Sequence, residues 1–80
     1  MRLDKYLKIT RLIKRRTVAN EACDAGRVLV NDRAARASYE VKEGDVVEIR
    51  LGQKPLRVEV LSIEESPKKE DAARNYRVIE

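Results

Sequence analysis

The chain has 80 residues, including 18 lysines and arginines, 14 aspartates and glutamates, one cysteine and no histidine, so its formal net charge is +4. These residues cannot supply the four ligands of a usual zinc site or a histidine base for a nucleophile, so we expect no metal, no cofactor and no enzymatic activity. Apolar runs of two or three residues fall far short of the roughly 20 that span a bilayer, and a lone cysteine forms no internal disulfide, which favours a cytoplasmic protein without membrane contact.

The first 16 residues carry the whole positive excess of the chain. They hold seven basic residues and one acid, a net charge of +6, whereas the remainder holds 11 basic and 13 acidic residues, a net charge of −2. Ordinary solvated surfaces mix both signs, and a local excess of this size attracts polyanions. We therefore expect an anionic partner for the seven basic residues, which are Arg2, Lys5, Lys8, Arg11, Lys14, Arg15 and Arg16.

Residues 2–10 have the spacing of a short amphipathic helix. Leu3, Tyr6 and Leu7 form an apolar row at i, i+3 and i+4, and the basic residues of the stretch fall on a side away from it. The row favours core packing for Tyr6 over stacking on a base. Two roles remain open for Asp4: it orients basic side chains by hydrogen-bonded pairing, or it stabilises the first helical turn.

A second helix is predicted from Thr17 to Ala25. The hydroxyl of Thr17 suits an N-cap, and Gly26 suits a left-handed end of the helix. Cys23 lies among small apolar residues, which favours a buried spacer over a redox role. The N-terminus of this helix would add partial positive charge beside the preceding basic run.

The rest of the chain has the patterns of short strands. Val28–Val30 followed by Asn31 and Asp32 predicts a small hairpin, and residues 47–51 and 56–60 alternate as an antiparallel pair. Ser66 and Pro67 predict the start of a helix over residues 68–75, before a closing strand over 76–79. The fold class is therefore α+β: two short N-terminal helices packed on a small, mostly antiparallel sheet, with a short C-terminal helix and closing strand.

The order of these motifs resembles the RNA-binding domain named after ribosomal small-subunit protein four. The resemblance rests on the opening Arg2–Leu7, on Gly26-Arg27-Val28, on Val30-Asn31-Asp32 and on Gly44–Ile49. It implies a single RNA-binding domain over residues 1–80, with the family core at about 2–51 and an extension over 52–80. The RNA contacts implied are the seven basic residues of the N-terminal segment, with Arg27 and Asn31 as secondary contacts.

Over its full length the chain resembles the small free-standing members of this family that act in bacterial ribosome quality control more than it does the related heat-shock members, which usually carry a longer, lysine-rich C-terminal extension. That resemblance implies a monomer that binds large-subunit ribosomal RNA and peptidyl-tRNA on obstructed large ribosomal subunits. Such a protein steadies the tRNA in the peptidyl site while an alanine-tailing partner protein on the same particle extends the stalled chain.

A different class of function remains open, in which the basic face docks an acidic protein and the chain acts as an adaptor. Four acids of the predicted sheet region would then offer a separate protein-facing patch, and Tyr39 is either an exposed contact or a half-buried packing residue. The four acids are Glu40, Glu43, Asp45 and Glu48.

Overall fold

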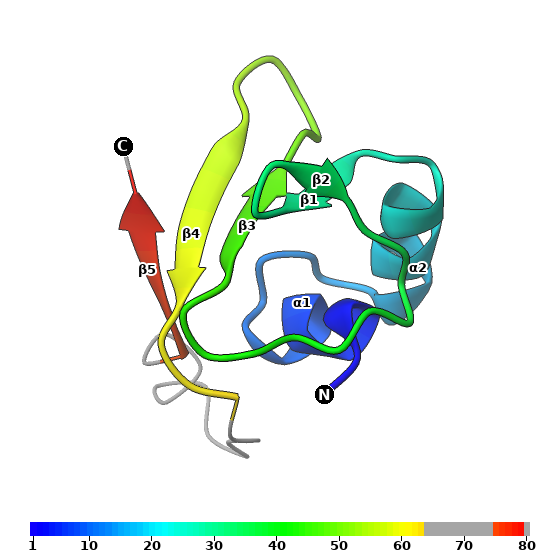
Figure 1. Ribbon diagram of the computed structural model, residues 1–80. Helices are drawn as coiled ribbons and strands as arrows, with labels where there is room; N and C mark the ends of the chain where they lie inside the picture. The colour runs from blue at the N-terminus through cyan, green and yellow to red at the C-terminus, as the bar shows by residue number, and fades with distance from the viewer. Residues whose placement is uncertain (64–74, 80) are drawn as a thin grey trace.

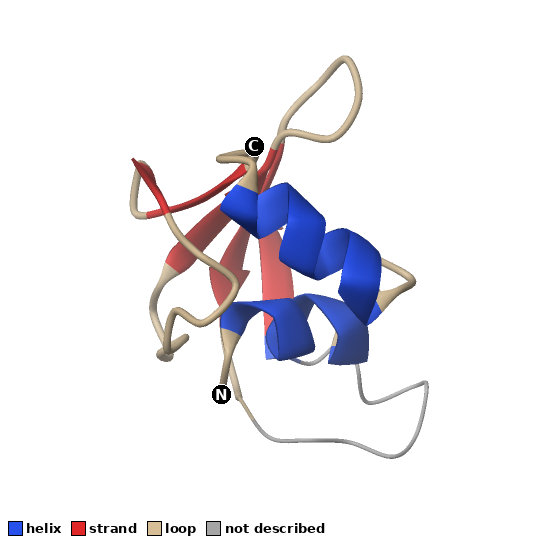
Figure 2. Cartoon of the chain, turned by 90° about the vertical axis from the view of Figure 1, so that its right-hand side faces the viewer, coloured by secondary structure: helices blue, strands red, loops and turns tan. Residues whose placement is uncertain are grey.

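The computed structural model describes residues 1–63 and 75–79, which form two helices and a five-stranded antiparallel sheet (Figure 1). The strand order in the sheet is β2-β1-β3-β4-β5. Figure 2 shows the two helices lying together over one face of the sheet. The elements are α1 (Leu3–Ile9), α2 (Arg16–Asp24), β1 (Val28–Val30), β2 (Arg33–Ala34), β3 (Val46–Ile49), β4 (Leu56–Val60) and β5 (Tyr76–Ile79).

The predicted hairpin at Asn31 and Asp32 is confirmed. Both residues have left-handed backbone conformations, with φ of 52° and 68°, which a two-residue turn requires if its twist is to match that of the flanking strands. The Asn31 side chain donates to Asp45 Oδ1 at 3.1 Å and accepts from the Val46 N–H at 3.0 Å. The turn is therefore fastened to the start of β3.

The start of α2 differs from the prediction, and its end agrees with it. The helix begins at Arg16, Arg15 occupies the N-cap, and no side chain caps the helix, so the assignment of Thr17 as N-cap is wrong. Arg16, the first residue of α2, contacts α1 instead, through its Nε and Asp4 Oδ2 at 3.2 Å. At the other end, Gly26 has a φ of 78°, and the Gly26 and Arg27 N–H groups bond the last free carbonyls, as in a Schellman motif.

The core lies between the helices and the sheet. Leu3, Tyr6 and Leu7 are fully buried against the inward-facing valines of the strands, which confirms the packing role predicted for Tyr6. The Tyr6 hydroxyl donates to the carbonyl of Asn75 at 2.7 Å, so α1 is tied to the residue that precedes β5. Burial also raises the pKa of Tyr6 far above its usual value.

Three further expectations have different outcomes. The strand predicted over 47–51 runs from Val46 to Ile49 instead, and Leu51 lies outside it, partly exposed. The strand's predicted antiparallel pairing with residues 56–60 is confirmed as β3 with β4, and the closing strand predicted over 76–79 is confirmed as β5, which pairs with β4. The predicted helix start at Ser66 and Pro67 and the helix over 68–75 lie, apart from Asn75, outside the described residues. Within the described part of the chain, no helix has the length and apolar character needed to cross a membrane.

Candidate RNA interface

A buried carboxylate, that of Asp4, lies where the two helices meet. Its side chain is 3% exposed. Asp4 Oδ1 accepts from Arg2 Nε at 3.2 Å and from the Lys5 N–H at 2.8 Å. Asp4 Oδ2 accepts from Arg16 Nε at 3.2 Å and from Asn20 Nδ2 at 3.3 Å. Both roles left open for Asp4 are therefore filled, since it orients two arginines and also binds a backbone N–H in the first turn of α1.

Each arginine of this cluster is bound to Asp4 through its Nε, and its terminal nitrogens are available to a ligand. Each side chain of Arg2 and Arg16 is 48% exposed, and each contacts Asp4 through Nε. Within the described part of the chain, the terminal nitrogens of both guanidinium groups have no protein acceptor. Because guanidinium is a planar, multidentate donor, a pair fixed in this way suits the phosphate groups of a nucleic acid.

The charge state of Asp4 follows from its partners. Burial raises the pKa of this carboxyl, but hydrogen bonds from Arg16, Asn20 and the Lys5 N–H, together with the Arg16 charge, outweigh that effect. The net result is a pKa below the ordinary value. Asp4 is thus an anion at neutral pH and keeps both guanidinium groups in place.

The connection between the helices returns the chain to this cluster through a strained turn. Arg11 has a φ of 61°, at a position after a helix end that glycine usually occupies. The Thr10 hydroxyl donates to the carbonyl of Tyr6 at 2.7 Å, and the Ile13 N–H donates to that of Leu7 at 3.1 Å. The buried side chains of Thr10 and Ile13 fix the turn and leave Arg11 exposed.

The structure brings some of the nine predicted contact residues together and separates others. Arg2 and Arg16 converge on Asp4, whereas Arg27 lies beyond the opposite end of α2 and Asn31 lies in the β1–β2 turn, where its side chain binds Asp45 and Val46. Lys5 is half-buried. The exposed basic residues of the set are Arg2, Lys8, Arg11, Lys14, Arg15, Arg16 and Arg27.

A hollow of about 380 Å³ adjoins the Asp4 cluster at the start of α2. Arg16, Asn20 and Thr17 line it together with Asp4. Asn20 was not among the predicted site residues, although its position four residues after Arg16 on a helix is the signal that could have found it. With its amide nitrogen bound to Asp4, Asn20 has its carbonyl oxygen as a remaining acceptor.

Two other predictions concern residues outside this cluster. Asp45 and Glu48 are buried and bound to neighbouring side chains, so the four-acid patch considered for a protein partner is wrong, and only Glu40 and Glu43 of that set are exposed.

Cys23 is buried as predicted. Its burial, together with nearby carboxylates, raises the pKa of the thiol to about 11, so it stays protonated at neutral pH. Among the described residues, no group of three potential metal ligands occurs.

Comparison with known proteins identifies relatives over nearly the whole chain. The model of the S4 domain matches residues 1–47. The RQC P-site tRNA stabilizing factor of Streptococcus pneumoniae is 57% identical over 79 residues, which cover 99% of this chain and 90% of that protein. The factor of the same name from Bacillus subtilis is 49% identical over 79 residues, covering 99% and 92%.

A solved structure supports the same relationship. Heat shock protein 15 of Vibrio cholerae, described as trimeric, is 28% identical to this chain. It superposes with a TM-score of 0.90, over 99% of this chain and 81% of the other. The predicted fold family is therefore confirmed on both sequence and structure.

Proposed function

The chain belongs to the S4-domain family of RQC P-site tRNA stabilizing factors, and from that premise we propose that it binds large-subunit ribosomal RNA together with peptidyl-tRNA on obstructed large ribosomal subunits. There it steadies the tRNA in the peptidyl site. This supports the addition of C-terminal alanines to the stalled chain by a partner protein on the same particle. We also propose that it acts in the cytoplasm as a monomer and performs no chemistry of its own.

The observation that carries this proposal is the pair of guanidinium groups anchored on Asp4. One carboxylate fixes two cations at the junction of α1 and α2, so the cluster keeps a net positive charge while its donors are already oriented. Preorganised donors lose less conformational entropy on binding than free arginine side chains do. Such a cluster can hold phosphates of structured RNA without any reacting group.

Salt dependence follows from the number of phosphates that the basic residues neutralise. If five or six phosphates of duplex RNA are contacted, the logarithm of the binding constant falls with the logarithm of salt concentration with a slope of about −4.5 to −5.4. High salt is therefore expected to remove the protein from ribosomal particles.

Co-sedimentation tests the proposed function. The protein is mixed with free large subunits that carry peptidyl-tRNA, with vacant large subunits and with vacant whole ribosomes. We expect pelleting mainly with the first, and loss of pelleting for Arg16→Ala. Equal binding to all three particles, or to any duplex RNA, would contradict the proposal. Ribonuclease treatment before a pull-down separates it from the adaptor function, because an adaptor for an acidic protein would keep its partner.

The oligomeric state needs its own measurement, because the Vibrio cholerae relative is described as trimeric. Sedimentation equilibrium of the free protein is expected to give the monomer mass of 9.2 kDa. A mass near three times that value would contradict a monomer.

A further inference from the structure

A second hollow, of about 680 Å³, lies between the β1–β2 hairpin and the segment that follows β2. Its volume falls within the range of small-ligand pockets, about 300–1,000 Å³. Arg33, Arg36, Ser38 and Tyr39 line it, with the small side chain of Ala34 among them. Arg33 and Arg36 lie in residues 17–80, whose net charge is negative, so the charge count of the sequence did not identify them.

The charges of Arg33 and Arg36 are unopposed. Both residues are exposed, and neither forms an ion pair with any described residue. Three acids near them in the chain already bind other groups: Asp32 binds Arg57 at 3.7 Å, Glu40 binds the N-terminal amine at 3.0 Å, and Asp45 binds the hydroxyl of Tyr39 at 3.0 Å. A concave surface with two such arginines attracts an anion.

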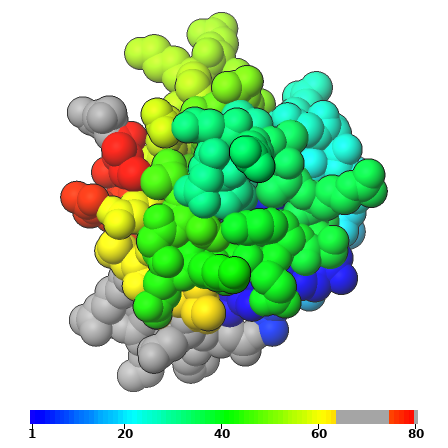
Figure 3. All heavy atoms as spheres, in the orientation of Figure 1, coloured from blue at the N-terminus to red at the C-terminus, as the bar shows by residue number. Residues whose placement is uncertain are grey.

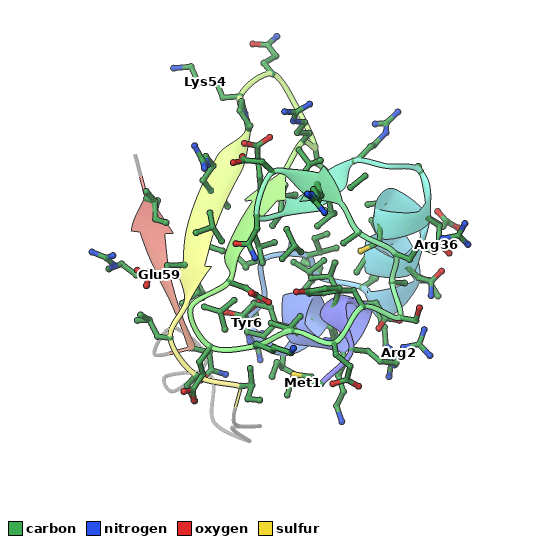
Figure 4. The ribbon with its side chains drawn as sticks, in the orientation of Figure 1. Met1, Arg2, Tyr6, Arg36, Lys54 and Glu59 are labelled. Carbon is green, nitrogen blue, oxygen red and sulfur yellow. The ribbon has the colours of Figure 1, made fainter. Side chains whose placement is uncertain are left out.

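The hollow adjoins the Asp4 cluster through a continuous stretch of backbone. The N–H groups of Leu3 and Asp4 donate to the carbonyls of Tyr39 and Ala37 at 2.8 and 3.2 Å. The Ala37 N–H donates to Asp24 of α2 at 3.2 Å. Figure 4 shows Arg36 and Arg2 on the same side of the molecule, and in Figure 3 the green atoms of the hairpin and the following segment adjoin the cyan and blue atoms of the helices.

The Tyr39 side chain is held in place by a buried carboxylate. Its hydroxyl donates to Asp45 Oδ2, which also accepts the Lys42 N–H at 3.0 Å, while Asp45 Oδ1 accepts from Asn31. Burial and the Asp45 carboxylate raise the pKa of Tyr39, so the ring stays neutral. A fixed, half-buried aromatic beside small apolar side chains suits the flat face of an unpaired base, and flanking arginines suit its phosphates.

We propose that this hollow binds an unpaired stretch of RNA, with phosphates on Arg33 and Arg36 and a base against Tyr39. The inference rests on the proposed function and adds a second contact to it, distinct from the RNA held by Arg2 and Arg16. A short single-stranded segment enters a pocket of this size, whereas a duplex presents only its backbone there. The protein thereby holds two RNA elements at once.

Fluorescence anisotropy with the full chain tests this contact. The probes are one labelled stem-loop RNA and the same stem-loop with a short unpaired tail. We expect the tail to strengthen binding and to steepen the log–log salt slope by about 1.4, or 0.7 for each of two single-strand phosphates. The double variant Arg33→Ala/Arg36→Ala is expected to lose the steeper salt slope and most of the gain from the tail, because only the contact of a base with Tyr39 remains. The control Arg50→Ala/Arg77→Ala removes the same charge from arginines that pair with Glu48 and Glu59, and it is expected to keep the gain from the tail.

A second pair of variants tests the aromatic part. Tyr39→Phe and Tyr39→Leu both lose the hydrogen bond to Asp45, but only the first keeps a ring. We expect Tyr39→Leu to bind the tailed RNA at least about fivefold more weakly than Tyr39→Phe does, in keeping with the usual strength of base–aromatic stacking. Equal binding by the two variants would contradict the proposed contact between a base and the ring of Tyr39.

The outcomes separate this inference from the proposed function. Arg16→Ala is expected to weaken the binding of both probes by the same factor. The ratio of the affinity for the tailed RNA to that for the untailed RNA therefore does not depend on the Asp4 cluster. The inference is overturned if the tail does not strengthen binding to the wild-type protein, or if Arg33→Ala/Arg36→Ala keeps the gain as the control does. The two arginines would then be candidates for contacts with an acidic protein partner. Failure of co-sedimentation with large subunits would instead overturn the proposed function alone.

Discussion

The arginines on the two sides of this molecule have opposite environments. On the sheet, Arg50 pairs with Glu48, and Arg77 pairs with Glu59. Arg57 lies between Glu48 at 3.6 Å and Asp32 at 3.7 Å. Where the helices meet, two arginines share the single carboxylate of Asp4. The sheet thus carries as many acids as arginines in its pairs, whereas the helix junction keeps a net positive charge.

This difference shows why a count of charges along the chain does not give the full arrangement of a binding surface. Exposed ion pairs contribute about 0–1 kcal/mol to stability, so the sheet pairs mainly neutralise charge that would otherwise attract anions there. The buried Asp4 does the reverse, because it orients two cations without cancelling both. The helix junction, where two cations share one acid, is therefore the surface that we propose for RNA.

The largest effect is expected when an arginine is removed from the Asp4 cluster. Arg16→Ala should weaken RNA binding by about 1–3 kcal/mol, because it removes an oriented, charge-assisted contact to phosphate. The matched control on the sheet is Arg50→Ala, which removes the same charge and should leave affinity nearly unchanged. Titration of both variants with large subunits at one fixed salt concentration measures the two affinities. An equal loss of affinity in both variants would contradict an RNA site at the Asp4 cluster.

A smaller effect is expected for Asp4→Asn, and its sign is informative. This change raises the net charge by one, so a purely electrostatic surface would bind RNA more tightly. If Asp4 orients the two arginines, affinity should instead fall, by about 1 kcal/mol, because a neutral amide holds them less strongly. Glu59→Gln, which adds the same charge on the sheet, is the control, and tighter binding by Asp4→Asn would contradict the orienting role.

The fold was predictable from the sequence to the extent that local patterns determine it. The i, i+3, i+4 row of Leu3, Tyr6 and Leu7 gave the first helix, and Asn31 with Asp32 gave the hairpin, because these signals act within a few residues. The N-cap of α2 was mispredicted, at Thr17 instead of Arg15, because no side chain caps this helix and a local capping signal therefore does not mark its start.

The site was predictable in composition but not in arrangement. The basic residues of the N-terminal segment were found by charge alone, yet nothing in a linear count shows that Asp4 joins Arg2 to Arg16 across two helices. Arg33 and Arg36 were missed because they belong to a part of the chain whose net charge is negative. Three acids of that part, Asp32, Glu48 and Glu59, pair with arginines of the sheet, which only the folded structure reveals.

Low pH is expected to reduce the free energy of unfolding by protonating Asp4, which removes its ionic contacts with Arg2 and Arg16. Because the folded pKa of Asp4 is lowered, its stabilising contribution is complete above the unfolded value of about 3.9. The contribution is lost as pH falls from there through the folded pKa. Urea unfolding of wild type and Asp4→Asn between about pH 5 and pH 2.5 should show a steeper loss of stability for wild type. Parallel curves would mean that Asp4 does not hold its partners in solution.

The smallest effect separates the core from the binding surface within a single helix. Tyr6→Phe removes the hydroxyl that donates to Asn75 and keeps the buried ring. The Asn75 carbonyl still accepts the Leu61 N–H at 2.9 Å, so the loss of stability should be modest, about 0.5–1.5 kcal/mol. RNA affinity should not change, because the ring is fully buried and cannot reach a base. Thermal unfolding and RNA titration of the same variant test both statements, and weaker RNA binding at unchanged stability would show that Tyr6 does contact RNA.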